Sequence, residues 1–304
     1  MSERSLSRRL RDRAEAALVA ALAAFCRRLP PRATVRFGER LGGAVRHLDR
    51  RRRHVALANL ELAYGAALTA AQRDAIARGV YRHLGRYFFE CLMLFSHKDL
   101  RPFSSFVEFE NLEVGRAALE QHGAVIIITP HQGNWELLGG ALCERVTPLD
   151  VVVMPTRNPR LNERILALRA DLGMTAIGRE HAVPALFRSL RRGRSVGLLC
   201  DLNQKNGPDF ADFFGVPAAT VRTPGILAVR TGKPLVCVAS WSTGEPLRYR
   251  AAFAPPIVPT AGADPDVEAH RIVVEMNRQL EAFVRAHPDQ WNWIHPRWKT
   301  RPQR

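Results

Sequence analysis

The sequence has little that could cross a membrane. Its Ala-rich stretch from Ala14 to Cys26 has 13 residues, and a helix needs about 20 apolar residues to span a bilayer. Arg27 and Arg28 follow this stretch, where a secretory signal peptide would have a small-residue cleavage site. The stretch is therefore short for a spanning helix and unlike an export signal, and we expect the catalytic part to face the cytoplasm.

Paired cysteines are also absent. The five cysteines are scattered, odd in number and never spaced as C-x-x-C, which argues against a disulfide framework and against a zinc site. We find no internal repeat and no low-complexity tract. A chain of 304 residues without these features fits one large α/β domain with appended segments. We expect no metal and no cofactor.

Negative charge is scarce, above all near the start. From Arg4 to Arg53 the chain has 15 arginines, no lysine and few acids, and the whole chain carries a formal charge of +16 with a pI near 10.9. Such a charge indicates anionic partners: nucleic acid, a lipid head-group surface or an acidic carrier protein. Because arginines flank Ala14 to Cys26 on both sides, this helix fits an anionic membrane face. The alternative is a soluble helix packed on the domain.

Hydrophobic periodicity predicts two parts, a helical segment over residues 1–100 and an α/β domain over residues 101–304. Helices are expected at 14–28, 34–48, 51–64, 69–95, 115–121, 135–144, 161–172, 181–191, 223–231 and 265–285. Strands are expected at 107–110, 112–114, 124–129, 150–154, 195–200, 235–240 and, antiparallel, 249–253. The alternation of strand and helix predicts a mixed, largely parallel sheet flanked by helices.

The most informative segment joins the apolar run Ala124 to Thr129 to the sequence His-Gln-Gly-Asn-Trp-Glu, residues 131–136. The histidine follows a buried strand, where α/β proteins usually place their chemistry. Four residues separate His131 from Glu136, so the carboxylate could orient the imidazole and stabilise its protonated form. The alternative is a strand-end histidine bonded to backbone, followed by an ordinary acid in a first helical turn.

Two further strands also end in polar segments. Arg157 and Asn158 follow the strand that ends at Met154, although Asn-Pro is also a common helix entry. Asp201 follows the run from Ser195 to Cys200 as His131 follows its own run. Asp201 and His131 could therefore converge over adjacent strand ends.

Aromatic residues gather in two later segments. Phe213 and Phe214 read as an exposed apolar loop suited to an apolar chain in a substrate. The closing segment, residues 290–302, interleaves three tryptophans with Arg297, Lys299 and Arg301. It could be a membrane-interface belt, an anionic head-group cradle, a nucleic-acid stacking surface, or plain packing against the sheet.

These segments in this order resemble the lipid A biosynthesis acyltransferase family. The resemblance rests on residues 131–136, Asn158-Pro159, Asp201, 213–215, 218–220 and 290–302, and it spans about 108–302. It implies a mixed α/β fold like that of glycerolipid acyltransferases and a membrane-associated N-terminal helix at the cytoplasmic face of the inner membrane. It also implies a donor on acyl-carrier protein, an anionic glycolipid acceptor and a His-x4-Glu site.

On this basis we expect O-acyl transfer. His131 acts as general base, Glu136 orients it, and backbone N–H groups of the Gly133-Asn134 turn receive the oxyanion. Asn134, Arg157, Asn158 and Asp201 are expected to bind substrate, as are Arg297 and Lys299. No covalent intermediate is needed, because no Ser or Cys lies beside the histidine in the sequence.

One departure concerns the acceptor. The family usually has an arginine four residues before the Asn-Pro pair, and this chain has Met154 there. Either Arg157 makes the phosphate or thioester contact instead, or the acceptor differs, for example a phosphatidylinositol mannoside.

Two alternative functions belong to other classes of protein: a basic nucleic-acid-binding protein and an inactive membrane scaffold. The absence of a recognisable nucleic-acid module opposes the first, and the intact His131 and Glu136 oppose the second.

Overall fold

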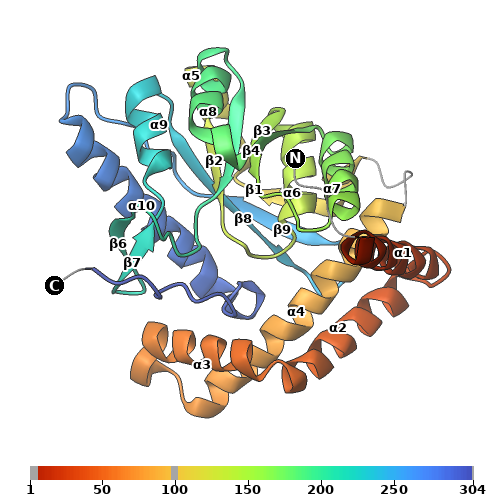
Figure 1. Cartoon of the computed structure of the whole chain (residues 1–304). Coiled ribbons are helices and arrows are strands. Elements are labelled where there is room, and N and C mark those ends of the chain that lie inside the picture. The colour runs from red at the N-terminus through yellow and green to blue at the C-terminus, as the bar shows by residue number, and fades with distance from the viewer. Residues whose placement is uncertain (1–5, 97–101, 303–304) are drawn as a thin grey trace.

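A mixed sheet with helices on both faces forms the centre of the molecule, and four N-terminal helices lie along one side of it (Figure 1). The computed structural model describes residues 6–96 and 102–302. Within these ranges, none of the helices combines the length and apolar character needed to cross a bilayer.

The helices are α1 (Leu6–Cys26), α2 (Pro31–Leu48), α3 (Arg50–Tyr64), α4 (Ala70–Ser96), α5 (Leu112–His122), α6 (Trp135–Arg145), α7 (Pro159–Asp171), α8 (Ala182–Arg191), α9 (Thr223–Thr231) and α10 (Pro265–Ala286). The strands are β1 (Val107–Glu110), β2 (Ile126–Thr129), β3 (Leu149–Val153), β4 (Met174–Gly178), β5 (Ser195–Leu199), β6 (Asp209–Phe213), β7 (Val216–Thr220), β8 (Leu235–Ser242) and β9 (Tyr249–Phe253). Short 3₁₀ turns lie at Gly65–Ala67, Phe103–Phe106, Arg179–His181 and Pro288–Gln290.

The main sheet has the strand order β1-β9-β8-β2-β5-β3-β4. Strands β8, β2, β5, β3 and β4 are parallel to one another, and β9 is antiparallel to β8 as predicted. β1 pairs with β9 in parallel and so runs with it against the other five. The predicted mixed, largely parallel sheet is therefore confirmed.

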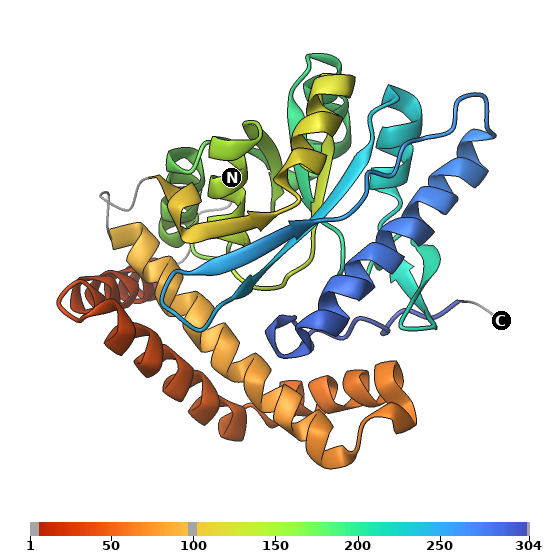
Figure 2. The ribbon, with the colours of Figure 1, turned by 180° about the vertical axis from the view of Figure 1, so that it is seen from behind.

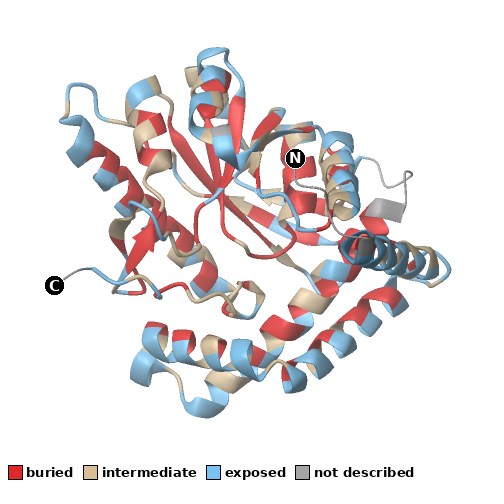
Figure 3. Cartoon of the chain, viewed as in Figure 1, coloured by how far each residue is buried: buried red, intermediate tan, exposed pale blue. Residues whose placement is uncertain are grey.

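Two apolar cores cover the two faces of this sheet. Alternate residues of β2 point to opposite faces, as the pleat requires: Ile126 and Ile128 enter the core with α8, α9 and α10, and Ile127 enters the core with α5, α6 and α7. β2 is buried along its whole length, and the strands beside it are mostly buried, as their red colour in Figure 3 shows. This burial on both faces explains why β2 reads as a continuous apolar run.

The N-terminal helices pack on one another and on the sheet. α2 and α4 cross closely at Gly85, where a Cβ atom would lie 2.0 Å from the Gly38 carbonyl oxygen. α4 passes below the joined ends of β8 and β9 in both views (Figures 1 and 2). There the buried Glu90 carboxylate accepts hydrogen bonds from the Tyr249 hydroxyl and the Leu247 N–H. These hydrogen bonds join α4 to the main sheet at the connection between β8 and β9.

The structure differs from the sequence prediction in three places. Residues 112–114 open helix α5 instead of forming a strand. Residues 209–220 form the hairpin β6-β7, with Phe213 and Phe214 buried, instead of an exposed loop. β4 was not predicted, because this edge strand is short and largely exposed and so lacks an apolar run.

Candidate active site

Four neighbouring parallel strands end at the same edge of the sheet, and a polar or sulfur-containing side chain follows each of them. His131 follows β2, Asp201 lies just beyond β5, Met154 follows β3 and Arg179 follows β4. Three of the four line one cavity, and Asp201 lies behind His131. In open parallel sheets this carboxyl edge is where ligands bind.

The predicted convergence of His131 and Asp201 is confirmed. One carboxylate oxygen of Asp201 accepts a hydrogen bond from Nδ1 of His131 at 2.7 Å. The other accepts from the His131 backbone N–H at 2.7 Å and from the indole N–H of Trp291 at 2.7 Å. Because Nδ1 is the donor to Asp201, the second ring nitrogen, Nε2, is the basic one, and His131 itself lines the cavity.

The Asp201 carboxylate is completely buried. Burial by itself would raise the pKa of Asp201, but the neighbouring His131 and the hydrogen bonds from His131 and Trp291 lower that pKa below its usual value. Asp201 is therefore held as a carboxylate against the imidazole ring.

Glu136 does not orient His131, and this expectation was wrong. Its carboxylate forms a two-pronged ion pair with Arg169 of α7, at 2.6 and 3.0 Å. Glu136 is the second residue of α6, where its backbone already belongs to the first helical turn. The spacing along the chain does not bring it to Nδ1, since Asp201 occupies that atom. The Glu136–Arg169 pair instead lines another part of the cavity wall.

The turn between His131 and α6 is tightly constrained. Gly133 has φ +63°, and a Cβ atom there would lie 2.2 Å from the Ser240 carbonyl oxygen, so only glycine fits. The Gly133 carbonyl lies 3.0 Å from Nε2 of the buried His83, which donates to it. The Gly133 N–H donates to the Gln290 carbonyl, so it is not available to an oxyanion. In the described residues, the Asn134 N–H has no acceptor.

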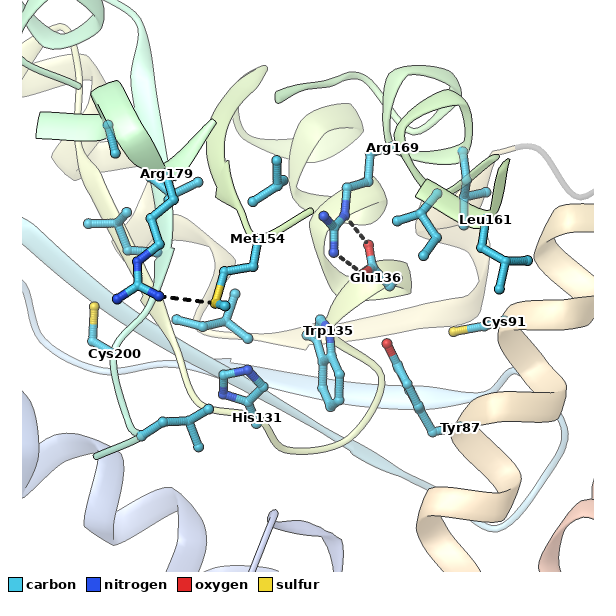
Figure 4. Close-up of a pocket in the computed structure, with 18 of the residues that line it drawn as sticks. Tyr87, Cys91, His131, Trp135, Glu136, Met154, Leu161, Arg169, Arg179 and Cys200 are labelled. Atoms are coloured by element: carbon cyan, nitrogen blue, oxygen red, sulfur yellow. Dashed lines mark hydrogen bonds and ion pairs between the residues drawn. The ribbon is translucent and has the colours of Figure 1, made fainter. Parts of the chain in front are cut away.

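The cavity has a volume of about 1580 Å³ and lies between α1, α4, α7, α8 and the strand ends. In Figure 4, Arg179, Met154 and Cys200 lie to one side of the His131 ring, and Trp135, Tyr87 and Cys91 lie to the other. Trp135 separates the sides: it meets the His131 ring edge-on at 5.2 Å and stacks on Tyr87 at 4.1 Å. Beyond Tyr87 the wall is largely apolar. Its members there include Val19, Ala20, Ala23, Phe88, Leu92, Leu94, Phe103, Leu161, Ile165 and Leu168.

None of the six residues expected to bind substrate lines this cavity. Asn134 is buried and caps α6, because its side-chain oxygen accepts the Leu137 N–H. Asn158 is buried, caps α7 and donates to the Asp12 carbonyl of α1. Both asparagines therefore hold helices and do not face substrate, which corrects the prediction. Arg157 is exposed and is not part of the wall.

The closing segment is packed rather than exposed. Trp291, Trp293 and Trp298 are at most 5 % exposed and pack around the buried Phe213 and Phe214 in tilted and edge-on contacts. Of the readings of this segment, the structure supports packing and contradicts a belt, a cradle or a stacking surface. Phe213 and Phe214 likewise cannot receive a substrate chain where they lie.

Arg297 was also misassigned. It is fully buried and donates to the carbonyl oxygens of Leu202 and Ala219 and to the Thr220 hydroxyl. Burial lowers the pKa of Arg297 to about 10. Arg297 therefore ties the loop after β5 to the hairpin and does not bind substrate. Lys299 is exposed and outside the cavity wall, so its role in binding stays a prediction.

Sequence reasoning missed several residues of the cavity: Tyr87, Arg169, Arg179 and His295. Three of them lie on segments predicted as helix or as closing tail, with no strand-end signal to mark them. Arg179 alone had a recoverable signal, because it follows a strand, but that strand was not predicted.

The sequence profile of the family described as bacterial lipid A biosynthesis acyltransferase matches residues 1–300. With the fold and the strand-end site, this match defines the class of protein as an acyltransferase. The chain belongs to the bacterial lipid A biosynthesis acyltransferase family, as the order of its motifs had indicated.

Two kinds of curated relative are similar to the chain. The lipid A biosynthesis palmitoleoyltransferase of Escherichia coli K12 is 26% identical over 269 residues, covering 87% of this chain and 84% of that protein. The phosphatidylinositol mannoside acyltransferase of Mycobacterium tuberculosis H37Rv is 27% identical over 186 residues, covering 60% and 57%. Both relatives act in glycolipid synthesis, and the chain is an acyltransferase of glycolipid biosynthesis.

Proposed function

We propose that this enzyme moves a fatty acyl chain from acyl-carrier protein to a hydroxyl group of a lipid A precursor, at the cytoplasmic face of the inner membrane. The observation that carries the proposal is the His131–Asp201 pair, which faces a largely apolar cavity of about 1580 Å³. The pair supplies a general base, and the cavity supplies room for a hydrocarbon chain.

The reaction follows from the hydrogen bonds of His131. Nε2 removes the proton from the acceptor hydroxyl as its oxygen attacks the thioester carbonyl carbon. The C–O bond forms, the C–S bond breaks, and the imidazolium returns the proton to the leaving thiolate. The products are an ester and a free thiol. Asp201 stabilises the imidazolium between these steps, because it is held as a buried carboxylate 2.7 Å from Nδ1.

We assign oxyanion stabilisation to the backbone N–H of Asn134. Neither Gly133 nor Asn134 lines the cavity and Asn134 is buried, so this assignment requires that the substrate carbonyl reach the turn beside His131. Since the Gly133 N–H is bonded to Gln290, the expected pair of donors is reduced to the one at position 134. The Gly133 carbonyl is fixed by His83, and a trans peptide points its N–H opposite to its carbonyl. The Asn134 N–H is thus directed away from His83 and held there before substrate binds.

The cavity also holds two thiols, but they are not suited to covalent catalysis. Cys91 and Cys200 line its wall and are buried. Burial raises the pKa of each thiol well above its usual value. A thiol that stays protonated is a poor nucleophile, so direct transfer between the two substrates is favoured.

The N-terminal helices offer a surface for the membrane. α1 and α2 both line up large apolar side chains that are exposed, at positions 10, 18 and 25 and at positions 37, 41, 45 and 48: Leu10, Leu18, Phe25, Phe37, Leu41, Val45 and Leu48. These spacings place each set on one face of its helix. Arginines surround them, which suits an anionic lipid surface.

One other acceptor and two other classes of protein are alternatives to this assignment. A phosphatidylinositol mannoside acceptor is the second candidate, because one relative carries that name. A nucleic-acid role loses its main support, since the tryptophans proposed to stack bases are buried. An inactive scaffold is opposed by the intact His131–Asp201 pair.

Transfer by the purified enzyme tests the proposal. Acyl-carrier protein with a labelled acyl chain is mixed with a lipid A precursor or with a phosphatidylinositol mannoside, and products are separated by mass. We expect transfer to the lipid A precursor, lost in His131→Ala and kept in His54→Ala, which changes an exposed histidine of α3. Full turnover by His131→Ala would remove the base mechanism, and transfer to neither acceptor would remove the function.

A further inference from the structure

The basic side chains of the cavity differ in whether an acid neutralises them. Arg169 is paired with Glu136 through two hydrogen bonds. Arg179 also lines the cavity, but the one hydrogen bond of its side chain within residues 6–96 and 102–302 is to Met154, whose sulfur accepts from a guanidinium nitrogen at 3.4 Å. Lys205 lines the same cavity and has no carboxylate partner in the described part of the chain. Arg179 and Lys205 are exposed to solvent and carry positive charge without an acid partner at the cavity wall, which Arg27 and Arg164 also line.

Both cations lie on the His131 side of the cavity. Arg179 follows β4, and Lys205 lies in the loop that follows β5 and Asp201. Figure 4 shows the Arg179 guanidinium reaching toward Met154, on the opposite side of Trp135 from Tyr87. His295 lines the cavity with them and is half-buried, and its Nδ1 has no hydrogen-bond partner among the described residues. These groups make this side of the cavity cationic, although aliphatic side chains of α8 and β5, such as Leu186 and Leu198, line it too.

A guanidinium and an ammonium group without acid partners at one wall favour an anionic ligand with several oxygens, such as a phosphate monoester or a phosphate diester. Arginine presents a planar fork of donors to phosphate oxygens, and lysine adds a point charge. The Met154 thioether is neutral and only a weak acceptor, so it leaves the charge of Arg179 available while its side chain lies against the guanidinium.

We infer that Arg179 and Lys205 bind a phosphate ester of a substrate beside His131, and that Arg179 sets the position of that phosphate. This inference rests on the proposed function and names the residues that bind the phosphate of its substrate. The phosphate has two possible sources: the phosphopantetheine arm of the donor, or a phosphate on the glycolipid acceptor. The chemistry of recognition is the same for both.

Steady-state kinetics of charge-removing variants test the inference. Arg179→Met and Lys205→Met should each raise the KM of the phosphate-bearing substrate roughly ten- to a hundredfold, as expected for loss of a hydrogen bond to a charged group, with kcat changed less than about threefold. Arg188→Met is the matched control, since Arg188 is exposed on α8 and outside the cavity wall. The double variant Arg179→Met with Met154→Arg returns a cation to the adjacent position and should recover most of the lost affinity.

Four substrates identify the source. The acceptor is used with and without its phosphate, and the donor is used as acyl-carrier protein or as an acyl-pantetheine thioester, which lacks the phosphate. A KM increase in Arg179→Met that appears only with the phosphorylated acceptor assigns the site to the acceptor. An increase only with acyl-carrier protein assigns it to the donor. Unchanged KM values for all four, or equal changes with and without phosphate, would overturn the inference.

Direct binding separates this inference from the proposed function. Inorganic pyrophosphate is titrated into the wild-type enzyme and Arg179→Met by calorimetry, and we expect at least tenfold weaker binding by the variant. If the wild type transfers acyl chains while neither KM nor pyrophosphate affinity depends on Arg179, the inference fails and the function stands. If the wild type transfers to no acceptor, the function fails, and the pyrophosphate titration still decides whether the phosphate site exists.

Discussion

Asp201 holds His131 at two points, through the Nδ1 atom of the ring and through the backbone N–H, each at 2.7 Å. Because the carboxylate accepts hydrogen bonds from both the ring and the backbone of His131, it fixes the orientation of the ring as well as its tautomer. Nδ1 keeps its proton, and Nε2 stays basic toward the cavity. This relationship makes Asp201 the positioning residue for the proposed base, in place of Glu136.

Replacing Asp201 by asparagine should therefore lower kcat by roughly 10²- to 10⁴-fold with little change in KM. The amide can present an N–H to Nδ1, which favours the tautomer whose Nε2 carries the proton and cannot act as a base. Initial rates of acyl transfer measure the effect. Asp209→Asn is the matched control, because Asp209 bonds Nδ1 of His270 at 2.7 Å at the protein surface. A kcat equal to wild type in Asp201→Asn would contradict this role.

The Glu136–Arg169 pair should matter for stability first. Glu136→Gln leaves the Arg169 charge in a largely buried place, so we expect a loss of about 2 to 4 kcal/mol in the free energy of unfolding. The double variant Glu136→Gln, Arg169→Gln should recover part of that loss. Urea unfolding of the three variants measures it. A Glu136→Gln enzyme as stable as wild type but without activity would return Glu136 to the chemistry.

The strand-end part of the site could be predicted from sequence because strands of a parallel sheet end at one edge. His131 and Asp201 each follow an apolar run, and β2 and β5 are neighbours, so their convergence needed only the topology. The partner of Glu136 could not be predicted in this way. Arg169 lies 33 residues away on another helix, and nothing local in either segment marks the pairing.

Which side chains of the closing segment are buried could not be predicted from the sequence either. Residues 290–302 combine tryptophans with arginine and lysine, a composition shared by membrane-facing and packed segments. Only the tertiary structure shows that Arg297 finds three oxygen acceptors inside the protein. Asn158 is different, because Asn-Pro is a helix-start signal by itself. The alternative given for Asn158, that it starts a helix, is confirmed, because its side chain caps α7.

The lowered pKa of the buried His83 predicts that the free energy of unfolding decreases at acid pH. Burial lowers the pKa of His83 to about 4, although its hydrogen bond to the Gly133 carbonyl opposes that shift. Between pH 4 and about 6.5 the unfolded chain binds a proton at this histidine that the native protein does not, so stability rises with pH there and falls on acidification. The effect on the unfolding free energy should approach roughly 3 kcal/mol.

His83→Gln isolates this contribution. Glutamine can keep a donor to the Gly133 carbonyl but does not titrate, so the variant should lose less stability than wild type between pH 6.5 and 4. Urea unfolding at several pH values measures the difference. Parallel pH curves for the two proteins would show that His83 does not have a lowered pKa.

Arg297 should act on folding and leave substrate affinity unchanged. Because it is fully buried with three oxygen acceptors, Arg297→Met leaves those acceptors without a donor and should cost about 3 to 5 kcal/mol of unfolding free energy. Arg297→Lys should recover only part, since an ammonium group cannot match the guanidinium fork. Arg301→Met removes an exposed charge four residues later and is the control. Thermal unfolding gives the stability, and the KM of both substrates is measured at a temperature where each variant is folded. A raised KM in a fully folded Arg297→Met enzyme, with no loss of stability, would mean that the buried guanidinium reaches substrate after all.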